Sequence, residues 1–181
     1  MDLRDVRQFG HLFHELWISL AHATVASNLD LINLLSSCGN LKKLRCGGHF
    51  DEDGNPPLIV TAECCPLLED LDLRDILSPL TVLSGFINSC KHITKLSWSG
   101  TDLLDPFIYF IANIRKLKQL SLSCREGLTP GRLAVITTMT LDSLSLSSRG
   151  SGDWFTVASL QSFAGTNLSR SLTTISIEMS S

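Results

Sequence analysis

The stretch Cys65-Pro66-Leu67-Leu68-Glu69-Asp70-Leu71-Asp72-Leu73-Arg74-Asp75 carries a pattern that recurs along the whole chain. Leu68, Leu71 and Leu73 lie at relative positions 0, +3 and +5, and a cysteine stands at −3. The same frame can be laid on six other segments: Gly10/Phe13/Leu16/Ile18, Cys38/Leu41/Leu44/Cys46, Cys90/Ile93/Leu96/Trp98, Ile114/Leu117/Leu120/Leu122, Thr138/Leu141/Leu144/Leu146 and Ser169/Leu172/Ile175/Ile177. Subtraction of successive anchors (13, 41, 68, 93, 117, 141 and 172) gives periods of 28, 27, 25, 24, 24 and 31 residues. Periods of this length are typical of repeat architectures, so the sequence predicts a solenoid of six to seven degenerate repeats.

Each repeat is expected to contain one strand and one helix. Positions +3 and +5 are apolar while +2, +4 and +6 are mostly polar or small, which is the alternation of a short strand with one buried face. Helical spacing follows between the strands, as at Leu29, Leu31, Ile32, Leu34 and Leu35, and again at Leu80, Leu83, Phe86 and Ile87. Strands joined by helical crossovers run parallel. We therefore predict an α/β solenoid in the form of a short arc, with parallel strands on the concave face and helices on the convex face.

These residues resemble the leucine-rich repeats, in particular the cysteine-containing repeats that follow F-box motifs in ubiquitin-ligase substrate receptors. The family pattern begins Cys-Pro-x-Leu-x-x-Leu-x-Leu, and Cys65 to Leu73 matches it position by position. Thr101-Asp102-Leu103-Leu104 and Leu128-Thr129-Pro130-Gly131 echo its second half. The second cysteine of the family pattern is missing, because His49, Ile76, Thr101 and Arg125 stand at the corresponding positions. The resemblance covers roughly residues 10 to 178 and implies a leucine-rich-repeat domain that binds another protein.

The expected organisation is a single leucine-rich-repeat domain over residues 1–181, with residues 1–25 as an N-terminal cap or first repeat. Residues 13–18 fit the strand frame, although Phe13, Leu16 and Trp17 also fit a helix. The Leu-Pro and apolar hairpin of an F-box are not found in these residues, so a ubiquitin-ligase adaptor is expected as a partner only if an F-box lies outside this chain. The alternative is a structural scaffold, or a fragment of a larger repeat protein such as an immune-type sensor. An uncapped edge strand formed by Leu172, Ile175 and Ile177 would favour that alternative, because terminal repeats normally need a polar cap.

Composition excludes several classes of function. The chain is 44% hydrophobic and 18% charged, with a formal net charge of −3, so nothing in its overall charge favours nucleic acid. No signal-peptide core or stretch long enough to cross a bilayer is evident, so no membrane association is expected. Cys38, Cys65 and Cys90 share one frame position, which indicates small buried hydrophobes rather than disulfides. We therefore expect an intracellular protein, either cytoplasmic or nuclear.

Catalytic and metal chemistry receive little support. A zinc site could draw on Cys38, Cys46, His49 and Cys64 or Cys65, but paired Cys-x-x-Cys spacing is missing and the repeat frame places three of these cysteines in the core. The acids at 51–53 lack the alternation and closing Glu of a calcium loop. No Gly-x-Ser-x-Gly motif accompanies the many serines. His11 and His14 are expected to be partly buried residues of a capping segment rather than ligands of a metal ion. We predict no enzyme activity, no metal and no cofactor.

The inner surface of the sheet is the candidate binding site. In a parallel, in-register sheet each of the positions +2, +4 and +6 forms a row of side chains about 4.8 Å apart. The early rows are charged and the later rows are rich in serine. The predicted partner-binding residues are Trp17, Lys43, Arg45, Asp70, Asp72, Arg74 and Lys95. They could form a recognition surface, because Trp and Arg dominate many protein contacts. Alternatively, Glu15, Lys43, Asp70 and Lys95 could only neutralise one another on a solvated face.

The charged early strands are expected to contribute more to binding than the serine-rich later strands. A partner that reads charge is expected to lose more affinity from Arg45→Glu than from Ser121→Glu or Ser145→Glu. From the sequence alone, Arg45→Glu is expected to leave folding nearly untouched, because a solvent-facing residue contributes little stability.

Overall fold

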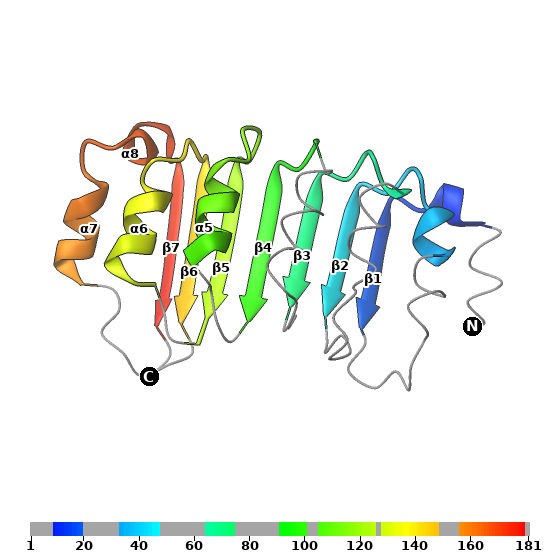
Figure 1. The fold of residues 1–181 in the computed structure, drawn as a ribbon, viewed down its shortest axis with the longest axis horizontal. Coiled ribbons are helices and arrows are strands. Elements are labelled where there is room, and N and C mark those ends of the chain that lie inside the picture. Colours follow the sequence, from blue (N-terminus) through cyan, green and yellow to red (C-terminus); the bar gives the residue numbers. More distant parts are fainter. Residues whose placement is uncertain are drawn as a thin grey trace. The chain divides into compact units, whose positions relative to one another are not determined.

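The computed structural model describes residues 9–19, 33–47, 64–74, 91–100, 105–125, 128–148 and 156–179 (Figure 1). The chain divides into two compact units, Met1–Ile93 and Thr94–Ser181, and each is described by itself. Both units are α/β and both contain parallel strands at the predicted frame positions. The expected α/β class, with the strand-and-helix repeat of leucine-rich-repeat proteins, is confirmed. The extent of a single domain over residues 1–181 stays a prediction.

The first unit contains three described strands. They are β1 (Glu15–Ser19), β2 (Lys43–Gly47) and β3 (Asp70–Arg74), and the short 3-10 helix η1 (Gly10–Leu12) precedes β1. The strands pair in sequence order and in parallel, with Leu16 opposite Leu44 and Leu44 opposite Leu71. The first frame therefore forms a strand rather than a helix, as the alternation favoured. Residues 33–36, the described end of the expected helical segment before β2, are helical.

The second unit contains four described strands and four helices. The strands are β4 (Lys95–Gly100), β5 (Gln119–Cys124), β6 (Ser143–Ser148) and β7 (Thr174–Met179). The helices are α5 (Asp105–Ala112), α6 (Pro130–Ile136), α7 (Val157–Phe163) and α8 (Asn167–Ser171). All three strand pairs are parallel and keep the frame register, for example Leu120 opposite Leu144 and Leu144 opposite Ile175.

Positions 0, +3 and +5 form the core of both units. The anchors Leu41, Leu68 and Ile93 are 0–1% exposed, and the +3 leucines at 71, 96 and 144 are 0% exposed. Cys38, Cys46 and Cys65 are likewise buried, as predicted, and Cys124 is also buried. At the last strand the pattern weakens, because Ile175 at +3 is 43% exposed.

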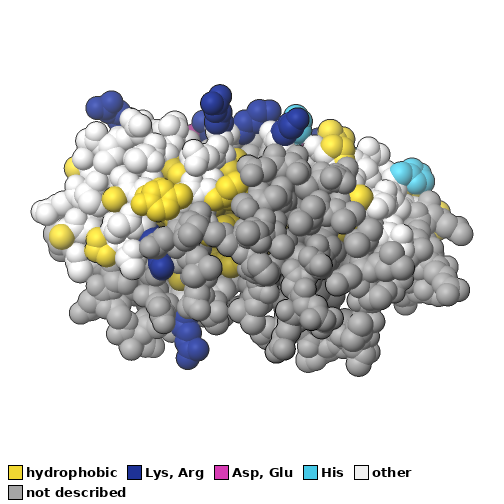
Figure 2. All heavy atoms as spheres, viewed as in Figure 1, with side chains coloured by type: hydrophobic (Ala, Val, Ile, Leu, Met, Phe, Trp, Pro, Cys, Tyr) yellow, Lys and Arg dark blue, Asp and Glu magenta, His cyan; other side chains and the backbone are white. Residues whose placement is uncertain are grey.

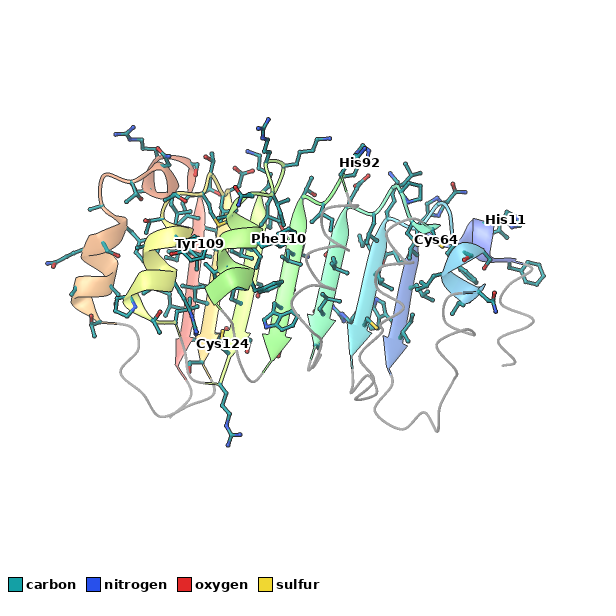
Figure 3. All side chains as sticks on the ribbon, viewed as in Figure 1. His11, Cys64, His92, Tyr109, Phe110 and Cys124 are labelled. Atoms are coloured by element: carbon teal, nitrogen blue, oxygen red, sulfur yellow. The ribbon has the colours of Figure 1, made fainter. Side chains whose placement is uncertain are left out.

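The helices of the second unit cover the apolar face of its strands. Helices α5, α6 and α7 lie side by side on one face of the strands (Figure 1). Phe107 of α5 contacts Trp98 of β4, with ring centroids 4.8 Å apart. Helix α6 begins with Pro130 after the N-cap Thr129, whose Oγ1 accepts a hydrogen bond from the backbone N–H of Arg132. Hydrophobic side chains reach the surface among these helices (Figure 2), and Tyr109 of α5 is 60% exposed (Figure 3).

Several sequence predictions fall outside the described residues. They concern the helical segment at 80–87, the acids at 51–53, and the individual residues His49 and Cys90. Among the residues that are described, no helix has the length and apolar character needed to cross a membrane.

Candidate functional site

The first unit brings together six of the seven predicted partner-binding residues. Side chains alternate between the two faces of a strand, so residues at +2, +4 and +6 share the face opposite the leucine core. Register then aligns them across strands: Lys43 lies opposite Asp70, and Trp17, Arg45 and Asp72 form one row. We call this surface of β1, β2 and β3 the polar face. Its predicted members are Trp17, Lys43, Arg45, Asp70, Asp72 and Arg74. The seventh, Lys95, belongs to β4 in the second unit.

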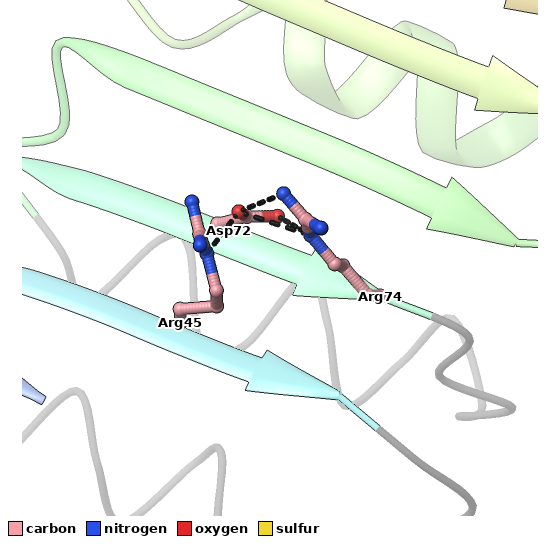
Figure 4. Close-up of polar contacts among 3 residues, drawn as sticks. All are labelled: Arg45, Asp72 and Arg74. Atoms are coloured by element: carbon pink, nitrogen blue, oxygen red, sulfur yellow. Dashed lines mark hydrogen bonds and ion pairs between the residues drawn. The ribbon is translucent and has the colours of Figure 1, made fainter. Parts of the chain in front are cut away.

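Asp72 is the centre of the polar face (Figure 4). Arg45 Nε donates a hydrogen bond to Asp72 Oδ2 at 2.6 Å, and Arg74 donates from Nε at 3.1 Å and from Nη2 at 3.0 Å. The side chain of Asp72 is 11% exposed, against 37% for Arg45 and 53% for Arg74. One carboxylate is therefore shared by two guanidinium groups, and charge-assisted hydrogen bonds of this kind fix the orientation of a guanidinium plane.

Trp17 is the exposed aromatic of this face. It is 70% exposed, and the guanidinium carbon of Arg45 lies 4.3 Å from the centroid of its ring. Stacking of this kind holds a guanidinium against an aromatic ring by cation–π attraction. Arg45 is thus held on one side by Trp17 and on the other by Asp72. Sequence register placed the three residues in one row, but only the structure reveals that they contact one another.

The +2 row behaves as a neutralising ladder. Lys43 Nζ donates to Glu15 Oε1 at 2.6 Å, and both side chains are about half exposed. This hydrogen bond and the charge of Glu15 raise the pKa of Lys43, with a smaller contribution from Asp70. Exposed pairs of this kind contribute little stability. For this row, the alternative of mutual neutralisation on a solvated surface describes the geometry well. Glu15 was not among the predicted site residues, although the register would have placed it beside Lys43.

Position +4 of β3 is not solvent-facing. Asp72 is 8% exposed and belongs to the buried polar residues of the chain. Its carboxylate accepts hydrogen bonds from the long side chains of Arg45 and Arg74. Arg45→Glu would place a second carboxylate beside Asp72, so the structure leads us to expect that this change destabilises the fold.

Gly47 is the +6 residue of β2. It ends β2, where register places it between Ser19 and Arg74, two residues beyond Arg45 on the same face. A Cβ added there would meet Arg74 Cβ at 3.4 Å and the Arg74 carbonyl oxygen at 3.5 Å, which are ordinary contacts. A small side chain is therefore compatible with this position.

The polar positions of the second unit have a different character. Lys95 is exposed at the start of β4, and Ser97, Ser121 and Ser145 are half-buried at +4. The described serine rows are uncharged, as the sequence indicated. Lys95 is thus placed on the expected side of its strand, and its role in binding stays a prediction.

Burial disfavours the thiolate form of two cysteines in the core of the first unit. Burial raises the pKa of Cys46 to about 12 and that of Cys38 above its ordinary value, although the hydrogen bond with Ser37 opposes the shift at Cys38. The thiolate is the form that binds zinc, so such burial disfavours metal. Of the proposed zinc ligands, Cys38, Cys46 and Cys65 are core residues. Within the described ranges, no three His, Cys, Asp or Glu side chains are grouped to hold a metal ion.

Comparisons with known proteins give a distant structural likeness. No protein-family model matches the chain, and no curated protein matches its sequence. Twelve chains of solved structure match. One of them is the C-terminal domain of tropomodulin from Caenorhabditis elegans, with a TM-score of 0.48 and 11% identity over 94% of this chain and 93% of that one. Because this similarity is low, nothing about the candidate site is inferred from it.

Proposed function

We propose that this chain is a non-catalytic protein-interaction module that binds a protein partner through the polar face of its first unit. The observation that carries the proposal is the pair formed by Trp17 and Arg45. Trp17 is 70% exposed while its ring is already stacked on a guanidinium 4.3 Å away. An exposed large aromatic whose neighbour is held in place loses little conformational freedom on binding, and Trp and Arg are the residue types most enriched at energetic centres of interfaces.

The rigid support of this pair favours the recognition interpretation over mutual neutralisation. Arg45 is anchored on the nearly buried carboxylate of Asp72, which also holds Arg74. Neutralisation alone would need neither the burial of Asp72 nor an aromatic ring on the outer side of Arg45. Glu15 and Lys43 of the +2 row would lie at the periphery of the interface, because their exposed ion pair contributes little free energy.

The test is a pull-down with the full chain compared across variants. Proteins captured by the wild type are identified by mass spectrometry, and each is scored with Trp17→Ala and with Tyr109→Ala. Tyr109 is a matched control, because it is an exposed aromatic (60%) on α5 of the second unit and is not part of the polar face. The proposal expects a partner that is lost with Trp17→Ala and kept with Tyr109→Ala. If every protein captured by the wild type is also captured by Trp17→Ala, the polar face is not the binding site.

The finer proposal concerns the class of partner system. The match of Cys65 to Leu73 to the cysteine-containing repeats supports a role similar to the substrate-recognition part of an F-box ubiquitin ligase. Such a role needs an F-box outside these residues. Sequencing the full-length transcript around Met1 would reveal one, and co-precipitation with the ligase adaptor would then test the role. A scaffold or a fragment of a larger repeat protein is the alternative, which the exposed Ile175 on β7 favours, because such a side chain would be covered by a further repeat.

A further inference from the structure

We infer that the second unit carries a separate binding surface, the basic edge, which takes an acidic segment of a partner protein. The basic edge consists of Arg115, Lys116, Lys118 and Arg170, which lie in the connections that lead into β5 and β7. Lys95 of β4 is not a member, because it already takes part in another interaction. The basic edge shares no residue with the polar face, so it stands or fails independently of the proposed function.

Positive charge is concentrated at this edge although the whole chain is negative. Three connections lead from a helix into a strand in this unit, at 113–118, 137–142 and 164–173, and every residue in them is described. They hold the four cations of the basic edge and one carboxylate, that of Asp142, which leaves three positive charges. The four cations are exposed, and Figure 2 shows Lys and Arg side chains along the upper edge, where Figure 1 places the amino-terminal ends of β5, β6 and β7. The chain as a whole has a formal net charge of −3, so the local field at this edge attracts an anion that the rest of the chain repels.

Three of the four cations keep their donors for a partner. Lys118 Nζ lies 3.8 Å from Asp142 Oδ1, in a long ion pair whose side chains are about half exposed. With the residues that the structure describes, Arg115, Lys116 and Arg170 make no side-chain hydrogen bond or ion pair. The backbone N–H groups of Arg115 and Lys116 also make no hydrogen bond to a described residue. One turn thus offers a guanidinium, an ammonium group and two N–H groups to carboxylate oxygens.

The segments that carry these cations are anchored to neighbouring repeats. Leu117 is 2% exposed, and the next N–H, that of Lys118, donates to the carbonyl oxygen of Thr94 at 2.8 Å. In α8, Ser171 Oγ donates to the carbonyl oxygen of Leu141 at 2.8 Å. The backbone is therefore already ordered, and binding would cost mainly the freedom of the cationic side chains.

The spacing of the basic edge favours a short, extended acidic segment. Strand β6 lies between β5 and β7, so the connections into β5 and β7 are about 10 Å apart. Three residues of an extended peptide span about the same 10 Å. A run of about four Asp or Glu residues can therefore reach both connections.

Nucleic acid and an anionic membrane fit the basic edge less well. The three connections contain no Phe, Trp or Tyr on which a base could stack. Their leucines at 117, 141 and 168 are 0–2% exposed and cannot enter a bilayer. Both alternatives are also extended polyanions that would meet the negative net charge of the chain, whereas a short acidic segment contacts only the edge.

The experiment measures binding of a fluorescein-labelled hexaglutamate peptide to the full chain by fluorescence anisotropy, at low and at physiological salt. Arg115→Glu should weaken binding roughly tenfold, because it removes a cation and adds an anion at the site. Arg125→Glu is the matched control: Arg125 is an exposed arginine directly after β5, at the other end of the same strand, and its reversal changes the net charge equally. Its effect should stay within about twofold. Trp17→Ala should leave the affinity unchanged, and hexaglutamine should not bind.

The outcomes separate this inference from the proposed function. Equal weakening by Arg115→Glu and Arg125→Glu would mean a response to net charge alone and would overturn the basic edge, as would failure of hexaglutamate to bind or equal binding of hexaglutamine. Tighter binding of a single-stranded oligonucleotide or of phosphatidylserine vesicles, lost in Arg115→Glu, would overturn the acidic protein segment as the partner. Loss of binding with Trp17→Ala but not with Arg115→Glu would place the acidic segment on the polar face instead. Urea midpoints check folding, and if Arg115→Glu fails to fold, the exposed and unpaired Lys116 allows the same test as Lys116→Glu.

Discussion

The nearly buried carboxylate of Asp72 should be the main source of stability within the polar face, and Asp72→Asn tests this. The substitution keeps the shape and one acceptor oxygen while removing the charge that Arg45 and Arg74 share at 2.6–3.1 Å. Hydrogen bonds to charged groups contribute roughly 1.5–3 kcal/mol when protected from water. Exposed ion pairs contribute roughly 0.2–1 kcal/mol. Because Asp72 is 11% exposed but its partners are 37% and 53% exposed, we expect an intermediate loss, about 1–3 kcal/mol for both pairs together.

Urea unfolding followed by circular dichroism measures this loss. The midpoint should fall while the slope stays constant, since the surface exposed on unfolding hardly changes. Asp142→Asn is the matched control: Asp142 pairs with Lys118 at 3.8 Å, and both side chains are about half exposed, so its change should stay within about 0.5 kcal/mol. A double-mutant cycle with Arg45→Gln should give a coupling of about 0.5–2 kcal/mol. Equal effects of Asp72→Asn and Asp142→Asn, together with zero coupling to Arg45, would refute the stabilising role of Asp72. The polar face would then be a set of exposed charges that only neutralise one another.

Three further predictions concern the core and its cysteines. Leu71→Ala should lower the free energy of unfolding by about 2–5 kcal/mol, because Leu71 is 0% exposed. Leu67→Ala, four residues earlier, should be nearly neutral, because Leu67 is 44% exposed. Urea unfolding midpoints of the two variants test this, and equal midpoints would mean that the repeat register is wrong. Cys46, whose pKa is raised to about 12, should be only about one part in 10⁴ thiolate at pH 8 and should resist a thiol reagent until the chain unfolds. The half-buried Cys64 should be labelled earlier. Peptide mapping by mass spectrometry measures the order in which the two cysteines are labelled, and early labelling of Cys46 would contradict this prediction. Purified protein should contain zinc far below one ion per chain, and stoichiometric zinc that is lost together with folding on chelation would overturn this expectation.

The sequence alone predicted the strands and their register. The frame seen at Leu68, Leu71 and Leu73 repeats along the chain, and every described strand lies at positions +2 to +6 of one copy, with β4 to β7 one residue longer. This succeeded because period-two alternation decides which face of a strand is buried, and a one-residue slip would expose every leucine. The first frame was ambiguous between helix and strand, and the neighbouring frames favoured the strand that β1 forms. The six site residues of the first unit could be assigned to one face for the same reason.

Only the tertiary structure decided what each of those residues does on that face. Trp17, Arg45 and Asp72 occupy the same frame position, yet Trp17 is 70% exposed and Asp72 is 8% exposed. Alternation determines the direction of a side chain but not what covers it. Coverage depends on rotamers of long side chains from adjacent strands about 4.8 Å away, which come from segments 27 or 28 residues apart. The sharing of Asp72 by two arginines and the stacking of Arg45 on Trp17 arise from those long-range contacts, and for that reason they could not be predicted from the repeat pattern.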